Sequence, residues 1–276
     1  MTKTIPSRVH IILARKARLA VAIRRGPSKR VCTVGWDRKT DTFRVGQWLK
    51  GRIYERRCDL SPDGRHLIYF AMNGKWESET KGSWSAISRA PYLKAIGLWA
   101  NGSGWNGGGL FTSDKSYWLN TFTCGDQELL APRGLRRDDH FPWQESYGGE
   151  CPGVYYVRLQ RDGWRLSGHE RAGKKDKSVF EKTVPNGWVL EKTAHATIDH
   201  PVGKGCYFDT HRLKKDDGSA TIDLPDWDWA DLDGKRIVWI VAGVLHAAYL
   251  NSQGLKDGKV LFDFNLLTFQ ELKAPY

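Results

Sequence analysis

The chain consists mainly of short apolar runs separated by polar turns. Leu19, Val21 and Ile23 stand at every second position of one such run, which is the period of a β-strand with one buried face. The run at 154–159 is interpreted as a further strand. No segment of convincing length shows the period of an amphipathic helix. The pattern therefore predicts an all-β fold.

Turn signals between the runs predict antiparallel hairpins. Asp63-Gly64, Asp233-Gly234 and Asn186-Gly187 each stand between two apolar runs. Tight two-residue turns favour these dipeptides because such turns need positive φ angles, which Gly, Asn and Asp tolerate. Asp162-Gly163 is interpreted as a turn of the same kind. We expect most strands to pair with their neighbours in sequence.

Two stretches interrupt the strand pattern. Residues 102–109 hold five glycines around Trp105 and are predicted to form a loop. Residues 132–153 are rich in charge, proline and glycine and are predicted to form a long surface excursion. Length does not decide between one large domain and two smaller ones, because all-β folds of roughly 200–250 residues commonly form one domain. We expect a single domain over residues 1–276.

Residues 60–70 and 230–240 resemble each other, since both have an Asp-Gly turn followed by basic, aliphatic and aromatic positions. Such self-similarity indicates a repeat architecture. Ser61-Pro62-Asp63-Gly64-Arg65 with the following apolar run resembles the repeat of WD40 and TolB-like β-propellers, and Trp36-Asp37 resembles the Trp-Asp dipeptide of that family. The resemblance implies a small antiparallel β-propeller of about five blades. A β-sandwich, whose hairpins would show the same turns, is the alternative.

Composition adds a strong basic excess, with 43 Lys and Arg against 31 Asp and Glu, a net charge of +12. Nine basic residues and no acidic one lie in the first 36 positions: Lys3, Arg8, Arg15, Lys16, Arg18, Arg24, Arg25, Lys29 and Arg30. A basic surface attracts polyanions through long-range attraction and counterion release. A solvated surface that keeps the protein soluble is the simpler reading.

The cysteines indicate a reducing compartment. Five cysteines, an odd number, are widely spaced and form no Cys-x-x-Cys pair, which argues against a disulfide framework. No apolar stretch approaches the roughly 18 residues of a membrane span. Basic residues interrupt any apolar core of a secretory signal. We therefore expect a cytoplasmic protein that does not associate with membranes.

Candidate chemistry is sparse. His195, His200, Cys206 and His211 are four possible zinc ligands, but their spacing matches no common zinc site. The glycine-rich stretch lacks the Lys-Ser/Thr of a phosphate-binding loop, and no nucleophile elbow or His-Glu-x-x-His motif is present. We therefore expect neither a cofactor nor an enzymatic activity.

The leading functional prediction is a non-enzymatic module or scaffold that presents surface loops to another protein. Binding residues concentrate in such loops, and the predicted contact residues are Trp105, Trp143, Arg136 and Arg137. We further expect an accessory subunit of a bacterial assembly of the defence or CRISPR type, although no motif in the sequence supports this.

The alternative is single-stranded RNA or DNA binding, because basic residues beside aromatic ones suit phosphates and bases. The candidate residues are Arg24, Arg25, Arg52, Tyr54, Arg56 and Arg57.

Overall fold

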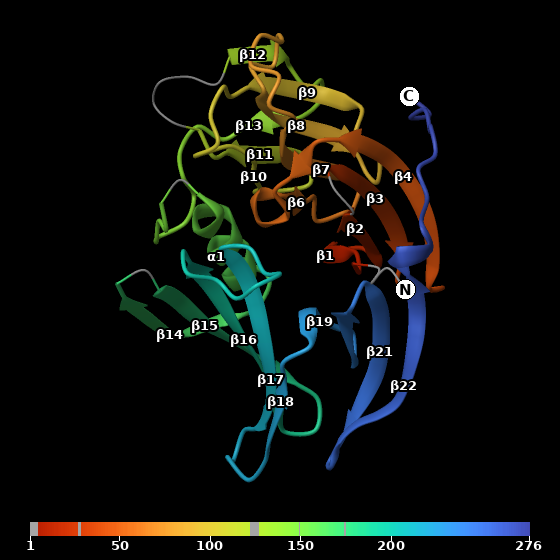
Figure 1. The fold of residues 1–276 in the computed structure, drawn as a ribbon, viewed down its shortest axis with the longest axis vertical. Helices are drawn as coiled ribbons and strands as arrows, with labels where there is room; N and C mark the ends of the chain where they lie inside the picture. The colour runs from red at the N-terminus through yellow and green to blue at the C-terminus, as the bar shows by residue number, and fades with distance from the viewer. Residues whose placement is uncertain (1–4, 27–28, 122–126, 149, 174) are drawn as a thin grey trace. The chain divides into compact units, whose positions relative to one another are not determined.

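Figure 1 shows the fold as a computed structural model, which describes residues 5–26, 29–121, 127–148, 150–173 and 175–276. Strands make up 53% of the chain and helices 6%, which confirms the all-β prediction. The chain divides into two compact units, and the single domain over residues 1–276 stays a prediction. Unit 1 is built mainly from residues 10–158 and 268–276, and unit 2 from residues 6–9 and 159–267.

Three sheets form unit 1. The first has the strand order β1-β2-β3-β4 and contains β1 (Arg8–Leu13), β2 (Leu19–Arg25), β3 (Arg30–Asp37) and β4 (Thr42–Lys50). The second has the order β12-β9-β8-β7-β5, with β6 also paired to β7, and contains β5 (Arg52–Ile53), β6 (Asp59–Leu60), β7 (His66–Met72), β8 (Ser83–Arg89), β9 (Ala95–Ala100) and β12 (Gln127–Leu130). The third contains β10 (Gly109–Phe111), β11 (Ser116–Leu119) and β13 (Arg136–Arg137), the last paired in parallel with β11. A 3₁₀ turn, η1 (Glu55–Arg57), links β5 to β6.

The second sheet of unit 1 is buried on both faces. Leu67 and Tyr69 of β7 join a core cluster with Val21 and Ile23 of β2 in the first sheet. Ile68, the residue between them, belongs to a separate cluster with aromatic residues of the third sheet. Alternation along β7 thus sends neighbouring side chains into two different cores.

The predicted strand at 154–159 is wrong, because α1 (Cys151–Arg161) covers it. Val154 and Val157, three residues apart, pack together on Leu110, and this spacing brings them onto one face of a helix. Gly163, with φ of +89°, follows the helix end, and its N–H bonds to the carbonyl of Gln160. Asp162-Gly163 therefore ends a helix instead of turning a hairpin.

Two antiparallel sheets form unit 2. The first contains β14 (Arg165–Ala172), β15 (Lys175–Val184), β16 (Trp188–Thr197), β17 (Tyr207–Lys215) and β18 (Thr221–Leu224), in this order. The second contains β19 (Trp227–Asp233), β20 (Arg236–Val241), β21 (Val244–Asn251) and β22 (Gly254–Asp263), followed by the 3₁₀ turn η2 (Phe264–Leu266). Trp188 donates its indole N–H to the carbonyl of Asn251 at 2.8 Å, so side chains of the first sheet reach the second.

The predicted hairpins at Asp63-Gly64, Asn186-Gly187 and Asp233-Gly234 are confirmed as the β6–β7, β15–β16 and β19–β20 turns. All three glycines, and Asn186, have positive φ. Each sheet runs from one edge strand to another, and none closes into a barrel within the described residues. Face-to-face sheets within a unit fit the sandwich alternative, whereas the propeller stays a prediction.

Candidate binding surface

Two loops of unit 1 emerge next to each other at one end of the second sheet (Figure 1). Met72, the last residue of β7, lies opposite Ser83 at the start of β8. Asn101, just after β9, donates its N–H to the carbonyl of the same Ser83 at 2.9 Å. The loops that follow β7 and β9, residues 73–82 and 101–108, therefore share this sheet end.

The loop at 101–108 carries Trp105, whose side chain is 66% exposed. Arg57, only 2% exposed, donates from Nη1 to the carbonyls of Gly104 and Asn106, both at 2.7 Å. Its guanidinium also lies 5.1 Å from the ring centres of Tyr54 and Phe70. One buried cation thus fixes the backbone on both sides of an exposed tryptophan.

Three consecutive glycines complete the attachment of this loop. A Cβ on Gly108, which has φ of +77°, would lie 1.9 Å from the carbonyl oxygen of Arg57. A Cβ on Gly107 would lie 2.2 Å from the ring of Phe70. Gly108 also donates its N–H to Ser85 Oγ at 2.8 Å. The predicted glycine-rich loop is confirmed, and the close backbone approach explains its composition.

Trp76 on the neighbouring loop is a second exposed ring, at 52%, and sequence analysis missed it. The ring packs on Gly82, where a Cβ would lie 2.6 Å from it. Ser83 joins the two loops, since its Oγ donates to the carbonyl of Ser103 at 2.8 Å and accepts from the N–H of Ser103 at 3.0 Å. We call Trp76 and Trp105 the tryptophan pair.

The other predicted protein contacts are less suited to binding. Trp143 is half-buried and packs edge-on against Trp118 and Phe141, so its predicted exposure is only partial. Arg136 and Arg137 are exposed as predicted but pair with the carboxylates at positions 138 and 139, each at 3.4 Å. Of the four candidates, Trp105 is the exposed aromatic ring whose flanking carbonyls a buried cation holds.

Most of the predicted nucleic-acid residues are structural. Arg24 is 4% exposed and stacks on Trp48, and Arg56 is buried against Tyr155. Arg25 forms an ion pair with Glu55 at 2.7 Å. Arg24, Arg56 and Arg57 are thus buried in unit 1 and Arg25 is paired, while nucleic-acid binding by these residues stays a prediction. Of the other two members, Arg52 is exposed and lies over the ring of the half-buried Tyr54, 4.4 Å from guanidinium carbon to ring centre.

The four zinc candidates do not form a site. His211 points into the interior of unit 2 at 4% exposure. His195 stands on the opposite face of the same sheet, because it is three residues from Lys192, the residue directly opposite His211. His195 stacks on Phe208 instead. Within the described residues, no three His, Cys, Asp or Glu side chains form a group suited to a metal ion.

Charged groups occupy the interior of unit 2. Lys182 of β15 contacts Asp231 of β19 at 2.6 Å, and Lys192 lies over the ring of Trp164 at 4.6 Å. Burial, and after it the nearby positive charge of Lys192, lowers the pKa of His211 to about 3. Burial acts to raise the pKa of Asp231, but the two lysines outweigh it and the pKa is lowered. Opposite charges therefore balance in this core, which suits a structural network.

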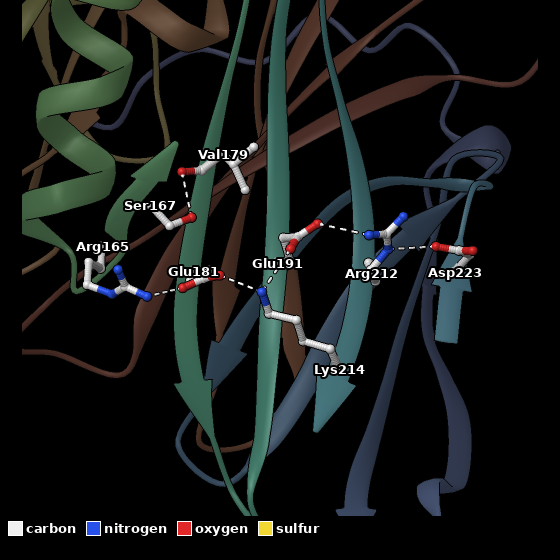
Figure 2. Close-up of polar contacts among 8 residues, drawn as sticks. All are labelled: Arg165, Ser167, Val179, Glu181, Glu191, Arg212, Lys214 and Asp223. Carbon is white, nitrogen blue, oxygen red and sulfur yellow. Dashed lines mark hydrogen bonds and ion pairs between the residues drawn. The ribbon is translucent and has the colours of Figure 1, made fainter. Parts of the chain in front are cut away.

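Six charged side chains form a ladder across the outer face of the first sheet of unit 2 (Figure 2): Arg165, Glu181, Glu191, Lys214, Arg212 and Asp223. Glu181 and Glu191 lie directly opposite each other on β15 and β16. Lys214 contacts both carboxylates, at 2.5 and 3.1 Å. Because acids and bases alternate in contact, the ladder stabilises the sheet and presents little unpaired charge to a ligand.

Comparison with known proteins adds no identity: no family model matches the chain, and no curated protein matches it. Among the described cysteines, Cys32, Cys58, Cys151 and Cys206 are free thiols, and Cys124 lies outside the described residues. In the part of the chain that the structure describes, no helix is long and apolar enough to cross a membrane.

Proposed function

We propose that this chain is a non-enzymatic protein-interaction module that binds its partner through the tryptophan pair. The observation that carries the proposal is the buried Arg57, which holds the carbonyls on both sides of the exposed Trp105. Burying a charged residue is costly unless it is fully bonded. Here the bonds that it makes fix a surface loop, which points to a function for that loop.

A fixed tryptophan suits an interface for two reasons. Tryptophan is enriched among the residues that dominate binding energy, because its large ring buries much area in a pocket of the partner. A loop that is already ordered loses less entropy on binding than a mobile one. Trp76, on the hydrogen-bonded neighbouring loop, enlarges the apolar contact.

The test is affinity purification of the tagged protein from its source cells, with and without nuclease, followed by mass spectrometry. The proposal expects a stoichiometric protein partner that survives nuclease and is lost from Trp105→Ala. Leu266→Ala is the matched control, because Leu266 is an exposed apolar residue of unit 2. A partner retained by Trp105→Ala, or lost equally from both variants, would contradict the proposal.

Three finer statements belong to the same proposal. The sheets are proposed to be blades of a small propeller, supported by sheets built mainly from strands consecutive in sequence. A crystal structure showing whether they close into a ring decides between propeller and sandwich. A cytoplasmic location is supported by the free thiols. Membership of a bacterial defence or CRISPR-type assembly is tested by the identity of the recovered partner.

A further inference from the structure

Four exposed cations gather where the first two sheets of unit 1 meet in sequence. Lys29 directly precedes β3, Arg30 begins β3, Lys50 ends β4, and Arg52 begins β5. The N–H of Gly51 donates to the carbonyl of Lys29 at 2.8 Å and so ties these segments together. We call these four residues the basic cluster.

The basic cluster contains two cations in direct opposition. Arg30 and Lys50 are register partners on β3 and β4, so their side chains project from the same face. Like charges directly opposite each other destabilise a sheet. None of the ion pairs among the described residues includes a member of the basic cluster.

The ladder of unit 2 contains a second pair of like charges in direct register, and that pair has a counter-charge. Glu181 and Glu191 are also direct register partners, but Lys214 lies between them and contacts both (Figure 2). Arg30 and Lys50 have no such counter-charge among the described ion pairs. An external polyanion would supply it, because each phosphate that binds relieves the repulsion.

A stacking surface lies beside the basic cluster. The guanidinium carbon of Arg52 lies over the ring of Tyr54, 4.4 Å from its centre, and Arg52 itself is exposed. Arginine planes and aromatic rings are the surfaces on which proteins stack unpaired bases. Arg52 is the register partner of Met72, so this surface also borders the loop that carries Trp76.

We infer that the basic cluster binds single-stranded nucleic acid. Lys29, Arg30 and Lys50 contact successive phosphates, and a base stacks on Arg52 above Tyr54. A single strand fits better than a duplex because its bases are free to stack. The inference uses none of the tryptophan pair and therefore stands or falls independently of the proposed protein contact.

The test measures fluorescence anisotropy of the full chain with a labelled single-stranded oligonucleotide and with its duplex. Salt is varied between about 50 and 200 mM. We expect the single strand to bind more tightly than the duplex. The logarithm of its affinity should fall with the logarithm of salt with a slope of roughly −2, since three phosphates contribute about 0.7 each.

Lys50→Glu is the decisive variant, because it places an opposite charge across from Arg30. Affinity for the single strand should fall at least about tenfold, while the melting temperature stays equal to or above that of the wild type. Lys235→Glu, the same charge reversal at an exposed turn of unit 2, is the control and should bind almost as well as the wild type.

Four outcomes overturn the inference. They are no binding of the wild type at low salt, equal binding of the duplex, wild-type affinity of Lys50→Glu, and an affinity loss of the same size in Lys235→Glu. A lower melting temperature of Lys50→Glu overturns the like-charge argument on which the inference rests. If the oligonucleotide fails to bind while a nuclease-resistant protein partner depends on Trp105, the proposed function stands and this inference fails.

Discussion

Replacing Arg57 by methionine tests whether one buried guanidinium holds the Trp105 loop. Methionine keeps much of the apolar packing against Tyr54 and Phe70 but cannot donate to the carbonyls of Gly104 and Asn106. A hydrogen bond from a charged donor contributes about 1.5–3 kcal/mol. Two such bonds give a loss of about 3–6 kcal/mol, a range that includes the roughly 3–5 kcal/mol lost when one partner of a buried charged pair is removed.

The loss should appear first as local opening of residues 101–108. Hydrogen exchange reports it through the amides of Gly107 and Gly108, which donate to the carbonyl of Asn120 and to Ser85 Oγ. Since about 1.4 kcal/mol corresponds to a factor of ten, these amides should exchange at least about a hundredfold faster. The Trp105-dependent partner should be lost as well.

Arg52→Met is the matched control, because Arg52 is exposed and loses only its stacking on Tyr54, worth about 0.5–1 kcal/mol. Loop exchange should stay at the wild-type rate in this variant. Unchanged protection of Gly107 and Gly108 in a folded Arg57→Met protein would refute the reasoning. Equal loss of protection along β7 and β8 would show instead that Arg57 supports the whole of unit 1.

Three further predictions concern stability. Lys50→Glu should raise the free energy of unfolding, measured in urea at low salt, by about 0.5–1 kcal/mol, because the new carboxylate faces Arg30. Added salt should reduce this gain. A destabilised variant would contradict the facing register. Gly108→Ala should lower the free energy of unfolding by about 3 kcal/mol or more in the same assay, because the new Cβ would meet the carbonyl of Arg57 and the residue has positive φ. A near-neutral change would show that the loop relaxes freely. Because His211 is neutral in the folded state with a pKa of about 3, against an ordinary value of 6.5, the unfolded state binds more protons between these values. Stability should therefore fall by up to about 5 kcal/mol as the pH drops through that window, and urea midpoints of His211→Gln should lack this dependence; an equal dependence in the variant would assign it to other groups.

The turns and strands could be predicted because their causes are local. Asn186-Gly187 and Asp233-Gly234 take positive φ, which few other residues tolerate, so a hairpin follows from the dipeptide itself. The strand predicted at 154–159 was wrong because local preference does not decide the structure there. Its β-branched and aromatic residues favour a strand locally, but packing of Val154 and Val157 on Leu110 selects the helix.

The candidate site was predictable only in part. Trp105 was recognisable because glycines surround it, and glycine-rich segments form surface loops. Trp76 gave no such signal, since its place depends on packing against Gly82, six residues further along the chain. The opposition of Arg30 and Lys50 depends on the register of β3 and β4, which includes a bulge that the sequence does not announce.

The sequence by itself determined the all-β class, the main hairpins and the excess of positive charge. Only the tertiary structure decided which of those charges are buried. Arg57 sits within a run of charged residues that would ordinarily face water. It is buried because the carbonyls of Gly104 and Asn106, 47 and 49 residues away in sequence, reach its guanidinium. A charged side chain can be buried only where folding brings bonding partners to it. The partners of Arg57 are too far away in sequence for a local pattern to indicate them.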